Sequence, residues 1–231
     1  MLDILRAGLE TLGLDPEKAP ALEAFARLVL KKNEVMNLTA ITAEDEFARS
    51  HLLDSAALLR VAELTGKTVV DVGTGAGFPG VPLAILCGGA ELTLLDSTGK
   101  RIAFLEEACA ALGLENVTCV NARAEEFALR RRERFDVAVS RAVASLPVLC
   151  ELCLPLVRPG GRFIAMKSVG SDEELARSEH AVNVLGGKLA GTVDYEIPTA
   201  DVRHRAILID KIAPTPEAYP RAFGKIKKHP L

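Results

Sequence analysis

A short apolar run with an acid near its end, followed by alternating glycines, constrains this chain more than any other feature. Residues 68–72 read TVVDV, and Gly73, Gly75 and Gly77 follow before a helical pattern. The run has the length and composition of a strand buried on both faces. Glycines at such a turn permit positive φ and let a ligand lie against bare backbone. The segment predicts a strand, a ligand-binding loop and a helix.

Beyond this loop, short apolar runs alternate with helical patterns. Runs suited to buried strands lie at 68–72, 92–95, 117–120, 137–139, 163–166 and 206–209. Helical patterns lie between them, at 80–87, 100–112 and 144–157, and another begins near Ser171. This alternation predicts a doubly wound, mostly parallel α/β sheet with helices on both faces. The last two strands, near 192–197 and 205–209, have no helix between them and predict an antiparallel hairpin.

The chain before the loop has a different pattern. Residues 1–62 carry apolar residues at helical spacing, and Asp15 and Pro16 suit a helix start. We predict a helical N-terminal extension over 1–62, a sheet domain over 63–213 and a basic, loosely held tail over 214–231. With 231 residues and 49% apolar residues, the chain is long enough to bury one full core.

Composition excludes several classes of protein. A net charge of −3 argues against coating nucleic acid or anionic lipid, so any RNA must meet local basic patches. The five cysteines have no metal-ligand spacing with the four histidines, which favours reduced thiols and no metal site. No signal peptide is evident, and no apolar run approaches the roughly 20 residues needed to span a bilayer. We expect a cytoplasmic monomer.

The glycine loop alone suits two ligands. A G-x-G-x-x-G drawn through Gly75, Gly77 and Gly80 would cradle the pyrophosphate of a dinucleotide. Counted from the strand end, however, the third dinucleotide glycine falls on Phe78. Asp71 at the strand end would repel a pyrophosphate but can orient the backbone around a cationic sulfonium. This favours S-adenosylmethionine as the cofactor.

Residues after the next two strands predict contacts to an adenosine. Asp96 ends the second strand, where a carboxylate can accept hydrogen bonds from both ribose hydroxyls. Ser97 and Thr98 would cap the next helix and face the same crevice. Ala124 and Glu125 would lie beside the adenine. In the plainer interpretations, Asp96 only caps a helix and Glu125 is a solvated first-turn acid.

The fourth strand ends in VSRA and carries no group typical of amino or carbon methylation. Enzymes for exocyclic amines usually place Asp or Asn before Pro-Pro and an aromatic here, and pyrimidine-carbon enzymes use a cysteine. Guanine N7 has a free lone pair, so an enzyme need only align it with the methyl group. The pattern is compatible with a ring-nitrogen acceptor but does not identify one.

Several blocks, in order, resemble one family. They run from Asn37 to Lys167, as NLTAI, HLLDSAALL, VVDVGTGAGFPGVPLAI, LLDSTGKRIAFLE, LENVTCVNARAEEF, VAVSRAVASL and GGRFIAMK, and resume at RHRAILIDKI and YPRAFGKIKKHPL. They are similar to the small-subunit rRNA guanine-N7 methyltransferase family, also called glucose-inhibited division protein B. The resemblance implies a class I, Rossmann-like, seven-stranded fold. It also implies a cytoplasmic enzyme that uses S-adenosylmethionine to methylate a guanine of 16S rRNA near the decoding site.

Position by position, the resemblance implies cofactor contacts from the glycine loop, from Asp96 to Thr98, from Ala124 and Glu125, and from Arg141. Together with the residues of the loop, the expected cofactor contacts are Asp71, Gly73, Gly75, Gly77, Phe78, Asp96, Ser97, Thr98, Ala124, Glu125 and Arg141. Arg141 is also the single catalytic candidate, expected to stack on the guanine or to hydrogen-bond it. The plainer interpretation of Arg141 is a buried ion pair with Asp71 or Asp136.

Basic residues near the crevice and in the tail are candidates for RNA phosphates. These are Lys100, Arg101, Lys167, Arg221, Lys225, Lys227 and Lys228. Lys167 is open to a second interpretation as a surface lysine, and the arginines at 130–134 to one as a solvated face. His51 and Asp54 share a helix face and predict a structural pair that joins the extension to the sheet.

Two other functions stay open at this point. A small-molecule methyltransferase would have a closed apolar lid and no affinity for RNA. A binding module would hold an adenosine ligand or RNA without turnover, and analogy of fold does not exclude it.

Overall fold

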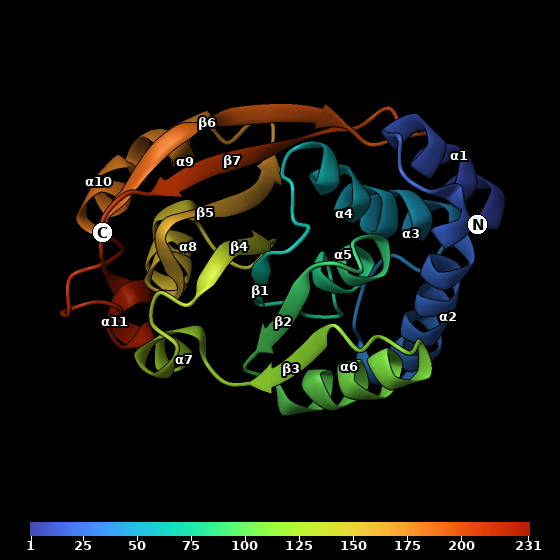
Figure 1. Cartoon of the computed structure of the whole chain (residues 1–231), viewed down its shortest axis with the longest axis horizontal. Coiled ribbons are helices and arrows are strands. Elements are labelled where there is room, and N and C mark those ends of the chain that lie inside the picture. The colour runs from blue at the N-terminus through green and yellow to red at the C-terminus, as the bar shows by residue number, and fades with distance from the viewer.

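The computed structural model describes residues 1–231 and contains one seven-stranded sheet in the order β3-β2-β1-β4-β5-β7-β6 (Figure 1). The strands are β1 Thr68–Val72, β2 Glu91–Asp96, β3 Val117–Asn121, β4 Phe135–Arg141, β5 Val157–Ser168, β6 Gly187–Glu196 and β7 Arg203–Lys211. Strands β1 to β5 pair in parallel, and β7 runs antiparallel to both β5 and β6. The expected mostly parallel sheet and its terminal hairpin are confirmed.

The strand order reverses at β1, which lies between β2 and β4. The chain moves outward from β1 in one direction through β2 and β3, and then returns to the other side for β4 and β5. A crevice for ligands therefore forms at the carboxyl ends of these strands. The glycine loop follows β1 at this point.

Helices cover both faces of the sheet (Figure 1). On one face lie the helices of the extension, with a π-helical stretch at Ala48–Leu53, and the two helices that follow β1 and β2: α1 Leu2–Leu12, α2 Ala19–Met36, α3 Glu44–Phe47, α4 Asp54–Ala57, α5 Gly80–Leu86 and α6 Gly99–Ala111. The other helices are α7 Ala124–Arg130, α8 Leu146–Cys153, α9 Asp172–Arg177, α10 Glu179–Val184 and α11 Phe223–Lys228. No helix combines the length and the apolar character needed to cross a membrane.

Two apolar clusters fill the spaces between the sheet and its helices. Successive side chains of a strand point to opposite faces, so Val69 joins one cluster and Val70 the other. The larger cluster, of 38 residues, contains Phe25 of the extension together with Leu94 of β2. The extension therefore shares its core with the sheet, and a boundary at residue 62 separates patterns of secondary structure rather than cores.

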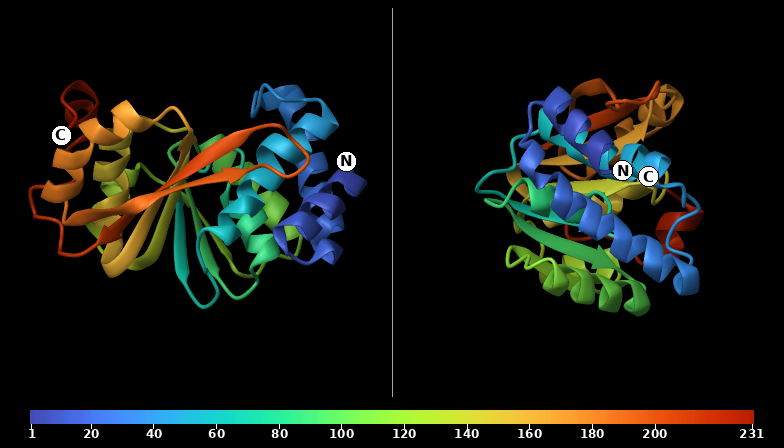
Figure 2. Two further views of the ribbon diagram at one scale, coloured as in Figure 1. Left: turned by 90° about the horizontal axis from the view of Figure 1, so that it is seen from above. Right: turned by 90° about the vertical axis from the view of Figure 1, so that its right-hand side faces the viewer.

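The β6–β7 hairpin reaches across to the extension (Figure 2). At this junction the Nε of Arg49 donates a hydrogen bond to the carbonyl oxygen of Thr199 at 2.8 Å. Tyr195 and His204 of the hairpin both bind the carboxylate of Asp54, at 3.0 and 2.8 Å. The hairpin and the extension thus meet on the same side of the crevice.

Residues 214–231 are folded against the sheet domain, whereas the sequence suggested a loosely held tail. Ile226 of α11 is fully buried in the smaller cluster, of 23 residues. Arg221 forms an ion pair with Glu151, whose side chain is completely buried on α8. The composition of the tail did not reveal this, because its single buried aliphatic anchor lies among exposed lysines.

Candidate active site

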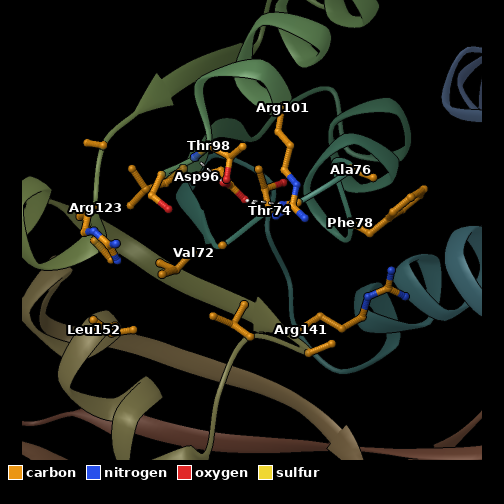
Figure 3. Close-up of a pocket in the computed structure, with 18 of the residues that line it drawn as sticks. Val72, Thr74, Ala76, Phe78, Asp96, Thr98, Arg101, Arg123, Arg141 and Leu152 are labelled. Carbon is orange, nitrogen blue, oxygen red and sulfur yellow. Dashed lines mark hydrogen bonds and ion pairs between the residues drawn. The ribbon is translucent and has the colours of Figure 1, made fainter. Parts of the chain in front are cut away.

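A cavity of about 430 Å³ lies at the carboxyl ends of the central strands (Figure 3). Its walls come from the glycine loop, from the ends of β2 and β4 and from the segment after β3. They are completed by residues of the extension and by one residue of α11, namely Leu38, Thr39, His51 and Phe223. The cavity lies where the sequence places a ligand, and it also includes walls that the sequence did not predict.

The glycines of the loop differ in function: one leaves space for a ligand, and the others allow close packing. Gly73, Gly75 and Gly77 all have positive φ, at 74°, 60° and 100°. Gly75 borders the cavity, and a Cβ there would meet no atom nearer than 3.9 Å. A Cβ on Gly77 would instead meet Phe25 at 2.9 Å and Leu105 at 2.8 Å. A Cβ on Gly73 would meet the Val143 side chain at 2.5 Å. Gly75 thus leaves room in the cavity, whereas Gly73 and Gly77 let the loop pack closely on Val143 and on the extension.

Asp71 lies beneath the loop and does not line the cavity. Its Oδ2 accepts hydrogen bonds from the Thr74 hydroxyl at 2.7 Å and from the Gly80 backbone N–H at 2.8 Å. Complete burial raises the pKa of this carboxyl to about 6. Asp71 therefore shapes the loop from behind, and any effect on a ligand passes through the loop backbone.

Asp96 lines the cavity at the end of β2. Its Oδ1 accepts from the Thr98 backbone N–H at 2.8 Å, and its Oδ2 accepts from the Gly75 backbone N–H at 3.0 Å. The nearest guanidinium nitrogen of Arg101 is 3.6 Å from Oδ2. A carboxylate has about four lone-pair sites, so both oxygens keep acceptor capacity toward the cavity. This geometry suits a pair of ribose hydroxyls.

The wall after β3 holds the residues expected beside an adenine. Ala124 and Glu125 line the cavity, and Glu125 is buried, whereas Ser97 and Thr98 across from them are exposed. Leu152 of α8 and Phe223 of α11 complete this end. Phe223 was not among the residues predicted from the sequence, because the tail was assigned to RNA. An aromatic residue amid the lysines was the available signal.

Arg141 ends β4 and reaches toward the extension, lining the cavity as it passes (Figure 3). Its Nη1 donates to the carboxylate of Asp54 at 2.8 Å and to the Ser50 carbonyl at 3.0 Å. The guanidinium lies over the Phe78 ring, 5.2 Å from its centroid. The partner of Arg141 is thus Asp54, and the pairing with Asp71 or Asp136 considered from the sequence is wrong. Its charge is neutralised, and one of its faces is occupied.

His51 belongs to the same network. Its Nδ1 lies 3.2 Å from Nη2 of Arg141, and its Nε2 lies 2.8 Å from the Thr39 hydroxyl. Because arginine only donates, Nδ1 is the acceptor, and a neutral ring then carries its proton on Nε2. Burial, together with the Arg141 charge, lowers the pKa of His51 to about 4. His51 and Asp54 join the extension to the sheet as expected, but through Arg141 rather than through a direct bond.

The predicted phosphate ligands fall into two groups. Arg101 lines the cavity, and Lys100 lies exposed beside it. Lys225, Lys227 and Lys228 are exposed on α11. By contrast, Lys167 donates to Glu174 at 2.9 Å and to the Ala144 carbonyl at 2.7 Å, so that it braces the loop after β4. Arg221 is likewise engaged internally, by Glu151.

Comparisons with known proteins decide the family. Residues 18–201 match the GidB family, described as rRNA small subunit methyltransferase G. A protein of Clostridium perfringens strain 13, named ribosomal RNA small subunit methyltransferase G, is 43% identical over 99% of this chain and 98% of its own length. Its namesake from Alkaliphilus metalliredigens is 45% identical, with the same shares covered. This chain belongs to the GidB family.

Solved structures agree with the fold of this GidB family member. A SAM-dependent methyltransferase from Aquifex aeolicus aligns with a TM-score of 0.54 at 19% identity, covering 71% of this chain and 93% of that one. TYW2 of M. jannaschii, determined in complex with AdoMet, aligns with a TM-score of 0.56 at 14% identity over 70% of this chain and 76% of its own. At these identities the likeness shows the fold alone, and the Rossmann-like methyltransferase fold is confirmed.

The cavity fits the cofactor of a methyltransferase. The free acceptor positions of Asp96 suit ribose hydroxyls, and the open space at Gly75 suits a ligand that lies against the loop backbone. Carboxyl groups at Asp71 and Asp96 flank the loop. Such a setting favours a sulfonium over a pyrophosphate, which removes the dinucleotide alternative for this member of the GidB family.

Proposed function

We propose that this chain transfers the methyl group of S-adenosylmethionine to N7 of a guanine in 16S ribosomal RNA near the decoding region. The observation that carries the proposal is a cofactor-sized cavity in which no side chain beside the end of β4 is free to act as a general base. The names of its GidB relatives, which specify the small-subunit rRNA, support the RNA class of the substrate. When bound, the cofactor supplies an electrophilic methyl group.

The side chains beside the end of β4 are all committed to one another. Arg141 donates hydrogen bonds to the Asp54 carboxylate and the Ser50 carbonyl oxygen, and Nδ1 of His51 accepts a hydrogen bond from Arg141. Asp54 is fully buried and is held by two further donors from the hairpin. No group here is placed to take a proton from an exocyclic amine. An acceptor with its own lone pair needs none, and alignment provides the main rate advantage.

Each end of the cavity has a role in this proposal. Asp96, Ser97 and Thr98 bind the ribose, and Ala124 and Glu125 border the adenine. Gly73, Gly75 and Phe78 shape the loop around the sulfonium and its methionine chain. Arg141, fixed by Asp54, orients the guanine at the end that faces the extension.

The acceptor enters from the side where the extension completes the cavity. Leu38 and Thr39 line this end, next to His51, whose ring is stacked on Phe78 at 4.8 Å between centroids. Beside Arg141, the rim formed by Ala142 and Val143 is exposed. An exposed rim favours a base presented by a large RNA over a small molecule sealed beneath an apolar lid.

We further propose that the protein acts in the cytoplasm as a monomer, with the division into extension, sheet domain and tail given above. The cytoplasmic location follows from a ribosomal RNA substrate. Light scattering at micromolar concentration tests the monomer, and a mass of about two chains would contradict it.

The test of the function is transfer of labelled methyl from S-adenosylmethionine to small subunits isolated from cells that lack the endogenous enzyme. We expect label on a single guanine, with cleavage chemistry that identifies N7. Label on RNA at another atom would overturn the acceptor. Cofactor binding without transfer to subunits or free RNA would favour a small-molecule enzyme or a binding module.

A further inference from the structure

The C-terminal segment supplies one wall of the cavity. Phe223, the first residue of α11, lines the cavity beside Ala122 and Ala124. The guanidinium carbon of Arg123 lies 4.9 Å from the centroid of the Phe223 ring, within range of a cation–π contact. Phe223 also packs against the smaller apolar cluster. An aromatic ring from the far end of the chain is thus built into the site that the central strands form.

A buried ion pair holds this segment in place. Glu151 is completely buried on α8, and its carboxylate accepts from the backbone N–H of Arg221 at 2.8 Å and from Nη2 at 2.6 Å. Nη2 also donates to the carbonyl oxygen of His229 at 3.0 Å. A buried carboxylate is costly unless it is paired in this way. The next residue on α8, Leu152, lines the same cavity, so the pair connects the tail to the cavity wall.

A second clamp fixes the chain before α11. The guanidinium of Arg132 donates to the carbonyl oxygens of Tyr219 at 2.7 Å and of Pro216 at 2.9 Å, and also to that of Thr215. Glu133, the next residue, accepts from the Thr215 backbone N–H at 2.7 Å. The segment is therefore held at several points, and Phe223 occupies a defined position.

We propose that residues 214–231 form part of the cofactor site, in which Phe223, held by the buried Glu151–Arg221 pair, closes the adenine end of the cavity. The inference rests on the cofactor of the proposed function but does not depend on the RNA acceptor. It gives the segment a second role besides contact with phosphates. The segment lies outside residues 18–201, which match the family model, although the two relatives align over 99% of the chain.

The position of the ring points to the adenine rather than to the methionine end. Phe223 borders the segment after β3, whose residues Arg123 and Ala124 follow the strand next to Asp96. The loop glycines and Arg141 belong to the opposite side of the cavity, as Figure 3 shows for Arg141 and Arg123. A planar base binds more tightly beside an apolar aromatic ring. Removing such a ring weakens binding measurably.

The decisive variant is Phe223→Ala, examined by isothermal titration calorimetry with S-adenosylmethionine, S-adenosylhomocysteine and 5′-methylthioadenosine. We expect the Kd of all three ligands to rise by about tenfold, because each contains the adenine. The matched control is Leu129→Ala, which removes an exposed apolar side chain from neighbouring α7. It should leave all three Kd values unchanged. Unchanged affinity in Phe223→Ala, or a loss only for the two ligands that carry the amino-acid chain, would overturn the proposal.

Glu151→Gln tests the ion pair. It should weaken binding of the same ligands, and the double variant with Phe223→Ala should bind no more weakly than Phe223→Ala alone, because the pair acts through the ring. Additive losses would contradict that coupling. Circular dichroism and thermal melting verify the fold, and if Glu151→Gln does not fold, the Phe223→Ala titration still decides the proposal.

These outcomes are separate from those of the methyl-transfer assay. Weak binding in Phe223→Ala together with absent transfer to RNA by the parent chain would support the cofactor wall and reject the proposed function. Normal binding in Phe223→Ala together with transfer to guanine would reject the wall and leave the function intact.

Discussion

Asp96 serves both the loop and the ligand, because each of its oxygens accepts a backbone N–H and still faces the cavity. We expect Asp96→Ala to weaken binding of S-adenosylmethionine by roughly 10- to 100-fold, the usual loss when charged hydrogen bonds are removed. Calorimetry measures this directly. Asp210→Ala removes a half-exposed carboxylate on β7 and serves as the control. Unchanged affinity in Asp96→Ala would contradict the ribose assignment.

The effects of Arg141 on turnover and on stability can be measured separately. We expect Arg141→Ala to lower kcat by about 100-fold, since misalignment by about 1 Å costs that much, with the Kd of the cofactor within about threefold. The substitution also removes the arginine partner of the buried Asp54 carboxylate, which keeps only Tyr195 and His204, so the melting temperature should fall.

The double variant Arg141→Ala with Asp54→Asn separates the two effects. It removes the buried charge that has lost its arginine partner and should recover part of the stability without recovering turnover. Single-turnover kinetics and thermal melting provide the two measurements. A large loss of cofactor affinity in Arg141→Ala would instead make this residue a cofactor ligand.

His51 gives a pH dependence with a definite sign. Its pKa is lowered from 6.5 to about 4 in the folded chain, so between these values the unfolded chain binds more protons. Stability contributed by neutral His51 is therefore complete above pH 6.5 and is lost as the pH falls toward 4. Asp71 acts in the opposite direction, because its folded pKa is raised from 3.8 to about 6.

The variant His51→Gln isolates the histidine. Glutamine retains an acceptor and a donor but does not titrate, so the difference in the free energy of unfolding between parent and variant should change between pH 6.5 and 4. It should be constant above pH 6.5. Urea unfolding across this range measures the difference, and a difference that does not vary with pH would show that His51 keeps its ordinary pKa.

Single residues of the site differ in how well a sequence predicts them. Asp96, Thr98 and Phe78 line the cavity because the strand-loop-helix pattern already fixes their position. The partner of Arg141 was missed, since Asp54 is separated from it by 87 positions and belongs to another element. Spacing along the chain reports local neighbours, whereas ion pairs of this kind depend on which elements pack together.

At the scale of elements, the glycine loop packs so closely on α2 that it leaves no room for a side chain at Gly77. Gly77 has a φ of +100°, and a Cβ there would approach Phe25 and Leu105 within 3 Å. We expect Gly77→Ala to destabilise the fold by about 3 kcal/mol, from overpacking in addition to backbone strain.

The control is Gly113→Ala, where φ is also positive at +65° but no atom lies within 4 Å of the new Cβ. It should cost only about 1 kcal/mol, the strain of a left-handed residue. Urea unfolding measures both variants. Equal losses would show that the loop yields to the extra methyl group and that the contact with α2 is soft.

Elements were predicted more reliably in type than in extent. The helix expected over 144–157 is α-helical over Leu146–Cys153 and continues as a 3-10 helix over Leu154–Leu156, because Pro155 lacks an N–H for a further α-helical turn. The strand expected over 163–166 extends over Val157–Ser168. Its first residues, VRPGG, look like a turn, but the neighbouring strand β4 pairs with Val157 across a register shift.

At the scale of the whole molecule, the sequence separated the extension and the tail from the sheet, and the structure unites all three. A helical pattern shows that a face will be buried, but it does not show which surface covers that face. The same limit applies to α11, which is held by a buried isoleucine and a buried ion pair, while Arg132 binds the chain before it. Long-range packing of this kind has no local signature.

The distribution of charge over the whole molecule leads to the last prediction. The net charge is −3, yet Lys225, Lys227 and Lys228 all lie exposed on α11, beside the cavity wall that Phe223 forms. Phosphate contacts release bound counterions, and each contact contributes about 0.7 to 0.9 to the slope of log K against log salt. We expect the triple alanine variant at these lysines to bind small subunits with a slope reduced by about 2.

The matched control is the triple alanine variant at Lys18, Lys31 and Lys188, which removes the same charge from exposed lysines elsewhere. Of these, Lys31 belongs to α2, across the sheet from α11 in Figure 1. Anisotropy titrations between about 50 and 200 mM salt give both slopes over a range where phosphate contacts dominate. If the slope depends on contacts at α11, the control keeps the parent slope. Equal reductions in both variants would mean that RNA responds to net charge alone, and the phosphate site would have to lie elsewhere.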